Sequence, residues 1–249
     1  MRKIMLSACI YDESTLQGQN RKKIMEAYSI PRFKQWSARH GFEFILIKEN
    51  NTGGRKHLWV KMFWMLDNWP LLRPDDRIVW IDGDSCVVDG SVCPIFKKDY
   101  SVPIDSTGIL CCGFYGLRVC DWTKRFIEEQ CTFARHKDNC INNAGMWDMF
   151  GDQEALHEVL GLPWEYPYQE YGTRKTTPFT VEEIKEHFEV LPVNWSVCFD
   201  PADSTSGSCI VPFFKPERYC PKDQVIIRHF PAGTIEQQWA IDYFKVPML

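Results

Sequence analysis

The first 90 residues alternate short apolar runs with longer amphipathic stretches, and this alternation constrains the fold more than any other feature. Between the runs, residues 20–40 and 57–69 have the apolar spacing of helices, although Pro31 is expected to break or kink the first. The apolar runs are short and polar-bounded, as buried strands are: 3–10, 43–48 and 78–82. This β-α-β-α-β order predicts an α/β, Rossmann-like fold with a mostly parallel central sheet flanked by helices.

The remainder of the chain continues the mixture of strands and helices. Strands are expected at 108–117, at 188–197 and from 224 to His229. Helices are expected at 121–135 and 151–161, and residues 163–180 and 200–222 have the composition of loops. Neither an internal repeat nor a linker divides the sequence, so we expect a single domain over residues 1–249.

Charge and hydropathy exclude two classes of protein. The formal net charge is −4 and no Lys/Arg-rich block occurs, which argues against general nucleic-acid binding. No segment reaches the roughly 18 uncharged apolar residues of a membrane-spanning helix. We therefore expect a cytoplasmic protein, for which a bacterial or viral origin fits, or a trimmed soluble domain.

The chain has 11 cysteines, an odd number, and none forms a C-x-x-C pair. Several lie in apolar segments, so we interpret them mainly as buried, reduced thiols. One group leaves an alternative open, because Cys131, His136 and Cys140 have a C-x4-H-x3-C spacing and Cys120 lies upstream. These four residues are candidate zinc ligands, although no short C-x2-C pair supports them.

Two carboxylates, Asp82 and Asp84, follow the third apolar run and are separated by Gly83. Alternate residues of an extended chain face the same way, so both carboxylates can point at one cation. Oxygen ligands of this kind suit Mg²⁺ or Mn²⁺. The alternative is a polar β-turn, since Asp-Gly is a common hairpin signal.

Three further motifs follow in order, and together they suggest a family. They are "DSTGIL" at 105–110, "GDQEAL" at 151–156 and "RHFPAG" at 228–233. With the Asp-Gly-Asp stretch and the helix that carries Lys61, they resemble GT-A nucleotide-sugar glycosyltransferases over residues 3–240. The resemblance is greatest to the glycogenin and bacterial lipopolysaccharide galactosyltransferase family (glycosyltransferase family 8), and related galactosyl- and mannosyltransferases are similar.

The resemblance implies a metal ion between the protein and a donor diphosphate. Asp82 and Asp84 then bind Mn²⁺ or Mg²⁺, His229 completes the metal ligands, and Asp82 also touches the ribose. A surface histidine that ends a strand is the alternative for His229. Ala8 and Tyr11 border the nucleobase, with Tyr11 stacked on it, and ordinary packing at a strand end is their alternative.

The resemblance also implies contacts to the transferred sugar. Lys61 lies near the donor, and a solvated lysine is its alternative. Asp105 and Thr107 fall where donor-sugar contacts are made, but a plain turn is also consistent with them. Asp152 and Gln153 match an aspartate–glutamine pair beside the transferred sugar and are the candidate catalytic residues. A helix N-terminal Asp, favoured by the dipole, is the alternative.

Two motifs depart from the family pattern. Three residues, rather than two, separate His229 from the next glycine, and no lysine or Pro-Trp pair follows. Arg228, Lys215 or Arg218 are candidates to replace that lysine at the leaving diphosphate. The strand start reads Ser-Thr-Gly at 106–108 where the family has asparagine-serine-glycine, so the identity of the sugar is left open.

The reaction implied is transfer of a sugar from a UDP- or GDP-sugar to a hydroxyl of a glycan, lipid-linked or protein acceptor, with retention of configuration. Residues 1–90 then form the nucleotide-binding half and 91–249 the acceptor and sugar half. A phosphatase of the haloacid dehalogenase type, with Asp82 as nucleophile and Asp84 as acid/base, is an alternative. A non-catalytic nucleotide-sugar binding protein is another.

Overall fold

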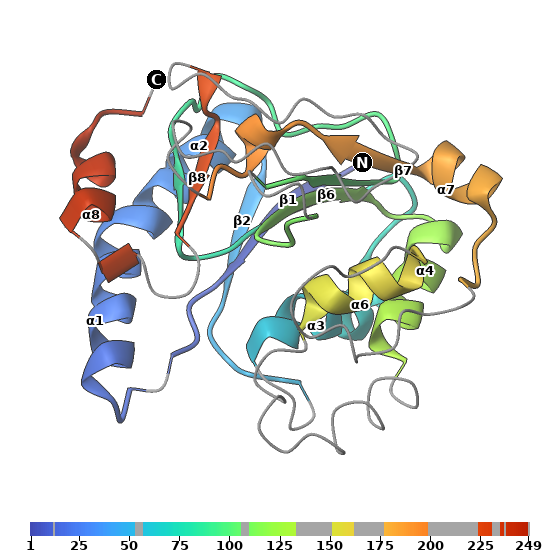
Figure 1. Ribbon diagram of the computed structural model, residues 1–249, viewed down its shortest axis with the longest axis horizontal. Helices are drawn as coiled ribbons and strands as arrows, with labels where there is room; N and C mark the ends of the chain where they lie inside the picture. The colour runs from blue at the N-terminus through green and yellow to red at the C-terminus, as the bar shows by residue number, and fades with distance from the viewer. Residues whose placement is uncertain are drawn as a thin grey trace.

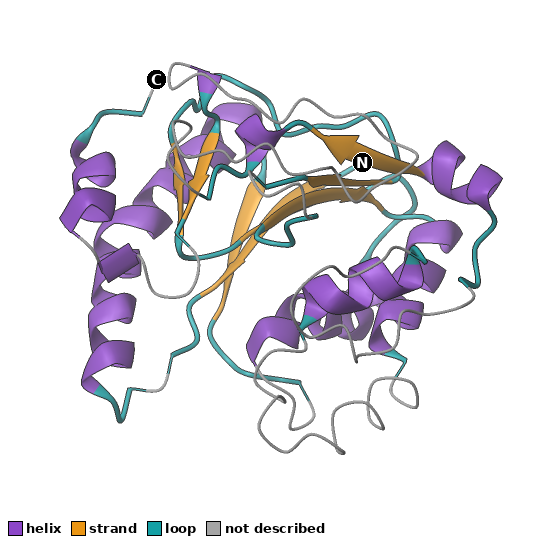
Figure 2. Ribbon diagram, viewed as in Figure 1, coloured by secondary structure: helices purple, strands orange, loops and turns teal. Residues whose placement is uncertain are grey.

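A six-stranded mixed sheet forms the centre of the molecule, with helices on both faces (Figures 1 and 2). The computed structural model describes residues 1–11, 13–52, 57–105, 110–132, 151–161, 177–198, 224–230, 235–236 and 238–248. The six strands are β1 (Lys3–Ala8), β2 (Glu43–Ile47), β3 (Arg77–Ile81), β5 (Tyr100–Pro103), β6 (Phe114–Arg118) and β7 (Phe188–Leu191).

The strand order is β2-β1-β3-β6-β5-β7. The β1–β2, β1–β3 and β5–β7 pairs are parallel, whereas β6 runs antiparallel to both of its neighbours. The predicted β-α-β-α-β start and the mostly parallel sheet are therefore confirmed. Because β1 and β3 are parallel, their carboxyl ends lie at the same edge of the sheet, where ligands bind in open α/β folds.

Alternating side chains bury both faces of the sheet. Ile4, Leu6 and Trp80 face a core that also contains residues of four helices, namely α3 (Val60–Asn68), α4 (Asp121–Cys131), α6 (Asp152–Val159) and α7 (Val181–His187). Met5, between Ile4 and Leu6, and Val79, next to Trp80, point to the other face of the sheet and pack in a second core. Phe33 and Trp36 of α2 (Ile30–His40) cover that second face. Figure 1 shows α3, α4 and α6 together on one side of the sheet.

The first helical segment continues through Pro31 instead of ending there. Helix α1 (Leu16–Ile24) leads into a π-helical turn at Met25–Ser29, which leads into α2. Proline has no backbone N–H and its ring crowds the carbonyl four residues earlier, and the wider π turn accommodates this defect. Gly41, in the left-handed region with φ 69°, then ends α2.

A separate two-stranded ribbon lies beside the main sheet. Strand β4 (Ser85–Val87) pairs antiparallel with β8 (Ile227–His229), so that Ser85 lies opposite His229. The final strand was predicted from residue 224 to His229; its end at His229 is confirmed, but it pairs only over 227–229. The strand predicted over 108–117 is also shorter: Cys111–Gly113 form a turn, and β6 starts at Phe114.

Several elements were not predicted from the sequence. These are the short strands β4 and β5, helix α7, and helix α8 (Gln238–Lys245) near the end of the chain. The α7 helix begins with a capping box, in which Thr180 accepts from the backbone of Glu183 and Glu183 accepts from the backbone of Thr180. This Thr-x-x-Glu pattern is legible in the sequence.

The proposed zinc group cannot form as a set of four. Cys120 precedes the first residue of α4 and Cys131 is its last residue. A rise of 1.5 Å per residue places the two backbone positions about 16 Å apart. The two thiols therefore cannot ligate one ion, while His136 and Cys140 lie outside the described residues.

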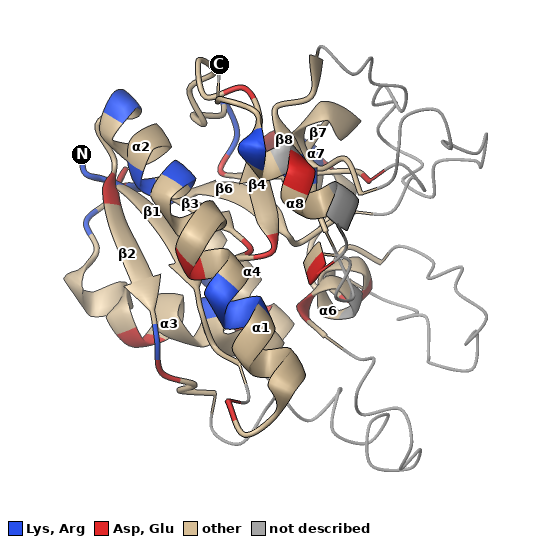
Figure 3. Cartoon of the chain, turned by 90° about the vertical axis from the view of Figure 1, so that its left-hand side faces the viewer, with Lys and Arg blue, Asp and Glu red and all other residues tan. Residues whose placement is uncertain are grey.

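Charged residues of both signs are interspersed along the described chain (Figure 3). One basic group, Arg21, Lys22 and Lys23, lies in the last turn of α1. Within the part of the chain that the structure describes, none of the helices has the length and apolar character needed to cross a membrane.

A buried carboxylate, that of Asp99, connects the start of β5 with the end of β6 and the end of helix α7. Asp99, just before β5, accepts hydrogen bonds from Arg118 Nε at 2.6 Å and lies 2.6 Å from His187 Nδ1. Its backbone N–H donates to His187 and its carbonyl accepts from Arg118. Burial by itself would raise the pKa of Asp99, but the bonds from Arg118 and His187 outweigh it and lower the pKa.

We expect Asp99→Asn to lower the free energy of unfolding by about 1–3 kcal/mol at neutral pH, because charged hydrogen bonds are lost. Since the folded-state pKa is depressed, the stabilisation is complete above the unfolded value near 4 and is lost as the pH falls through the folded value. Urea unfolding of both proteins should therefore show a gap at pH 7 that narrows at pH about 3.

Asp75→Asn is the matched control, because Asp75 also contacts Arg118, at 2.8 Å, but is exposed. Its substitution should change stability by less than about 0.5 kcal/mol. Equal effects of the two substitutions would contradict the role assigned to Asp99.

Candidate functional site

The Asp-Gly-Asp stretch is a turn, and it is also where the acidic groups converge. Residues 82–84 connect β3 to β4, with Ser85 N–H donating to the Asp82 carbonyl at 3.1 Å. The Asp82 N–H donates to the carbonyl of Gly113 at 2.7 Å, at the start of β6. Both hypotheses drawn from the sequence are therefore compatible, because the turn itself presents the carboxylates.

His229 reaches the same point from the other end of the chain. It lies opposite Ser85 in the ribbon, and its Nε2 is 3.3 Å from Asp84 Oδ1 and 3.8 Å from Asp82 Oδ2. One ligand atom from each of the three residues lies within 4.8 Å of the others. The structure thus brings together the three residues predicted as metal ligands, and their oxygen and nitrogen atoms suit a hard divalent ion such as Mn²⁺ or Mg²⁺.

Lys61 connects this group to Asp152. Its Nζ lies 2.7 Å from Asp152 Oδ2 and 3.3 Å from Asp82 Oδ1, and donates to the Cys112 carbonyl at 2.9 Å. The side chains of Lys61 and Asp152 are only 3% and 7% exposed. The alternative of a solvated lysine on α3 is therefore wrong.

The charges of this buried pair depend on each other. Burial would lower the pKa of Lys61, but the carboxylates of Asp152 and Asp82 raise it well above its usual range. Burial raises the pKa of Asp152, and the adjacent Lys61 ammonium opposes that rise. Lys61 therefore stays charged and keeps two carboxylates close together.

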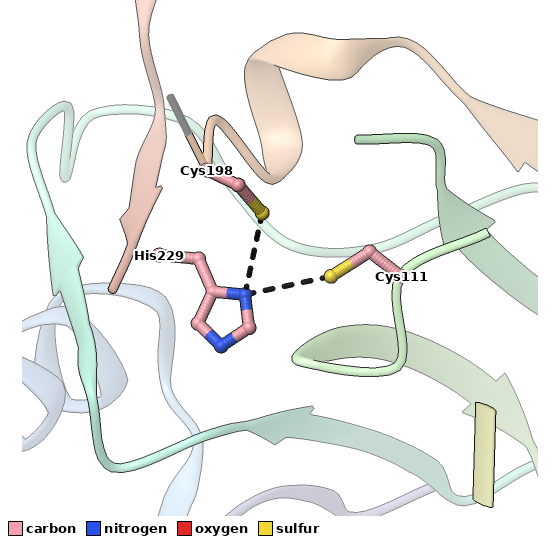
Figure 4. A group of neighbouring side chains, drawn as sticks. All are labelled: Cys111, Cys198 and His229. Atoms are coloured by element: carbon pink, nitrogen blue, oxygen red, sulfur yellow. Dashed lines mark hydrogen bonds between the residues drawn. The ribbon is translucent and has the colours of Figure 1, made fainter. Parts of the chain in front are cut away.

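The second nitrogen of His229 faces two thiols, which sequence reasoning did not connect to the site. Nδ1 lies 3.5 Å from Cys111 Sγ and 3.6 Å from Cys198 Sγ (Figure 4). The Cys111 pKa is held well below its usual value by a hydrogen bond from Cys198, aided by His229. Burial would lower the pKa of His229, but Cys111 and Asp84 raise it. In the sequence, Cys111 is recognisable only as a cysteine in an apolar segment. Its large separation from Cys198 follows no spacing pattern that would predict their contact.

Two glycines, Gly113 and Gly83, allow neighbouring groups to pack closely around the carboxylates. A Cβ at position 113 would lie 2.6 Å from His229 Cε1, so the imidazole ring packs directly on the Gly113 backbone. A Cβ at position 83 would lie 1.6 Å from Met25 Cε and 2.8 Å from the Ala8 carbonyl. The side chain of Met25 therefore fills the space beside Gly83.

The other candidate residues surround the same edge of the sheet. Ala8 ends β1, and Tyr11 lies partly buried beyond it. Burial raises the pKa of Tyr11, and Asp84 and Asp82 raise it further. Asp105 is buried just after β5. Gln153 follows Asp152 in the first turn of α6 and is partly exposed.

Three of the predicted positions lie outside the described residues. They are Thr107, and Lys215 and Arg218, two of the candidates for the missing basic residue. The third, Arg228, is buried and precedes His229 on β8. Adjacent residues of a strand point to opposite faces, so Arg228 points away from the face of His229.

Comparisons with known proteins identify the fold. No protein-family model matches the sequence, and no curated protein matches it. Among solved structures, a glycosyltransferase involved in glycosylation of the major capsid of PBCV-1 has a TM-score of 0.52 at 11% identity, covering 99% of this chain and 100% of that one. An active-site mutant of LgtC has a TM-score of 0.51 at 11% identity, covering 97% and 93%.

The chain has the GT-A fold of these glycosyltransferases. A structure of the galactosyltransferase LgtC with donor and acceptor sugar analogues gives a TM-score of 0.50 at 12% identity, covering 97% of this chain and 93% of that one. The resemblance inferred from short motifs thus extends to nearly the whole backbone, as the sequence predicted.

We expect Lys61→Met to lower the free energy of unfolding by about 3–5 kcal/mol, because it leaves the buried Asp152 carboxylate without a counter-charge. Adding Asp152→Asn should restore part of the loss, since the second substitution removes that charge. Urea unfolding of the single and double variants measures both effects.

Lys124→Met serves as the control. Lys124 lies on α4, is about half exposed, and contacts only Glu128 at 3.6 Å among the described ion pairs. Its replacement should change stability by less than about 0.5 kcal/mol. A Lys61→Met protein as stable as this control would contradict the buried ion pair.

Proposed function

We propose that this protein is a metal-dependent glycosyltransferase, which moves a sugar from a UDP- or GDP-sugar to a hydroxyl of a glycan, lipid-linked or protein acceptor. The observation that carries the proposal is the convergence of Asp82, Asp84 and His229 at the carboxyl edge of β1 and β3. That edge is where open α/β sheets bind nucleotides, and the backbone around it is that of solved glycosyltransferases.

The chemistry of the ligand atoms fits Mn²⁺ or Mg²⁺. Two carboxylates and one imidazole are hard or borderline ligands, and the carboxylates are partly exposed, which leaves them accessible to a divalent ion that a diphosphate could also bind. A bound divalent ion would supply Lewis-acid stabilisation of the departing diphosphate. Asp82 and Asp84 would hold the ion, and His229 would complete the set through Nε2.

The donor would lie along the first 90 residues, in the proposed nucleotide-binding half. Tyr11 offers a ring at the tip of β1, next to the carboxylates, and would stack on the nucleobase beside Ala8. Asp105 and Thr107 would contact the donor sugar. Residues 91–249 would carry the acceptor side, and we propose that the transfer retains the anomeric configuration.

Asp152 and Gln153 are the proposed catalytic pair at the transferred sugar. The Asp152 carboxylate is fixed by Lys61 at 2.7 Å, one ammonium away from Asp82. A carboxylate held there would stabilise positive charge at the anomeric carbon as the sugar–phosphate bond breaks. We therefore assign Lys61 a positioning role, in place of the donor contact inferred from the sequence.

The fold bears differently on the two alternatives, a phosphatase and a non-catalytic binding protein. The chain shares its backbone with glycosyltransferases over nearly its full length, which leaves no structural support for a phosphatase built on Asp82 and Asp84. A nucleotide-sugar binding protein without turnover could have the same fold, and a turnover assay distinguishes it from a transferase.

Metal-dependent release of UDP or GDP from nucleotide sugars tests the proposal. A panel of UDP- and GDP-sugars is first ranked by thermal stabilisation with Mn²⁺, since a ligand that binds the native state raises the melting temperature. The best donor is then used in a turnover assay. We expect Asp84→Ala to lower the rate by roughly a hundredfold, because a ligand that supports charge stabilisation is lost.

Asp89→Ala is the matched control, because Asp89 lies five residues further along and caps a turn through Ser91. It should keep wild-type turnover. Donor binding without turnover in the wild type would support the binding protein instead, and equal rates for Asp84→Ala and wild type would contradict the proposed metal site.

Gly113→Ala should weaken Mn²⁺ binding by about ten- to a hundredfold, because the new Cβ displaces the His229 ring that it meets at 2.6 Å. Calorimetric titration measures this affinity. Gly116→Ala, three residues further along in β6, is the control, since its Cβ meets the Phe96 ring instead. It should lower stability but leave Mn²⁺ affinity unchanged, and unchanged affinity in both variants would exclude His229 as a ligand.

A further inference from the structure

The cysteine pair beside His229 forms a second group of potential ligands, chemically unlike the carboxylates. Cys111, Cys198 and His229 are 2%, 6% and 7% exposed, and their ligand atoms lie within 4.8 Å of one another. Figure 4 shows both sulfur atoms directed at the same edge of the imidazole ring. Both cysteines are free thiols.

The distances match those of a tetrahedral zinc site. With Zn–S of 2.3 Å and Zn–N of 2.0–2.1 Å, tetrahedral angles place a sulfur and a nitrogen ligand about 3.5 Å apart. The observed separations from His229 Nδ1 are 3.5 Å to Cys111 Sγ and 3.6 Å to Cys198 Sγ. The ligands therefore need little movement to bind one ion.

Backbone hydrogen bonds hold the three ligands in place from three separate segments. The Cys111 N–H donates to the Pro103 carbonyl at 2.8 Å. The His229 N–H donates to the Val197 carbonyl at 3.1 Å, next to Cys198 in sequence. Ligands held in place before the ion binds favour a metal site, because little ordering is then needed on binding.

We propose that Cys111, Cys198 and His229 Nδ1 form a binding site for a thiophilic divalent ion of the zinc class, which shares the His229 ring with the carboxylate site. Thiolate and imidazole ligands select such ions over Mn²⁺ and Mg²⁺. On binding, the protons carried by the two sulfur atoms and by His229 Nδ1 are released to solvent, and the fourth position is taken by water. The site does not rest on the proposed function, because its ligands bind the ion whether or not the protein transfers sugar.

Cobalt binding tests the site in reduced protein. Co²⁺ bound by thiolates gives a charge-transfer absorption in the near ultraviolet, which oxygen ligands do not give. We expect this band to saturate at one Co²⁺ per chain in the wild type and to be lost in Cys111→Ser and in Cys198→Ser. Circular dichroism establishes that each variant is folded.

Cys112→Ser is the matched control, because Cys112 is adjacent to Cys111 and equally buried, but it packs in the core that contains α3, α4 and α6 and does not belong to this ligand group. It should keep the band. A wild type without the band, or a band that persists in both Cys111→Ser and Cys198→Ser, would overturn the proposal.

A measurement on unaltered protein guards against variants that fail to fold. X-ray absorption of the zinc-loaded wild type should give two sulfur neighbours at about 2.3 Å. A zinc ion surrounded only by oxygen and nitrogen would place it at the carboxylates and would overturn the site.

Discussion

The buried ammonium group of Lys61 is the electrostatic constraint on which this site depends. Two carboxylates, Asp82 and Asp152, approach it from different segments of the chain. Without the ammonium group between them, the two negative charges would repel each other. Trp80 lies beneath the same ammonium, with its ring centre 5.2 Å from Nζ, and also donates to Asp82. The lysine therefore fixes the relation between the β3–β4 turn and helix α6.

Much of the fold is legible in the sequence because local and long-range signals agree. The runs at 3–10, 43–48 and 78–82 are apolar on both faces, as strands covered by helices on both sides must be. The carboxyl ends of parallel strands share one edge, so the sequence alone predicts that Asp82 and Asp84 lie at that edge. His229, 145 residues after Asp84, was expected beside them because its late motif, "RHFPAG", resembles that of the glycosyltransferase family and follows an apolar strand.

What the sequence did not reveal is the packing between distant segments. The π-helical turn at Met25–Ser29 depends on Pro31 and on the contact of Met25 with Gly83, and only the first of these has a sequence signal. The contact of Cys111 and Cys198 with His229 joins three segments without any spacing rule. The burial of Lys61 was missed because a lysine on a helix is ordinarily solvated, and its partners lie far away in the sequence.

The position of His229 between sulfur and oxygen atoms has a consequence of its own. A neutral imidazole has one free lone pair, and the nitrogen that keeps the proton cannot ligate. When Nδ1 carries the proton and donates a hydrogen bond to a thiolate, Nε2 presents its lone pair to the carboxylates. When Nδ1 accepts a hydrogen bond from a thiol, or binds a metal ion, Nε2 carries the proton instead. The choice of tautomer thus transmits the chemical state of the two thiols, whether protonated, oxidised or metal-bound, across a single ring to Asp82 and Asp84.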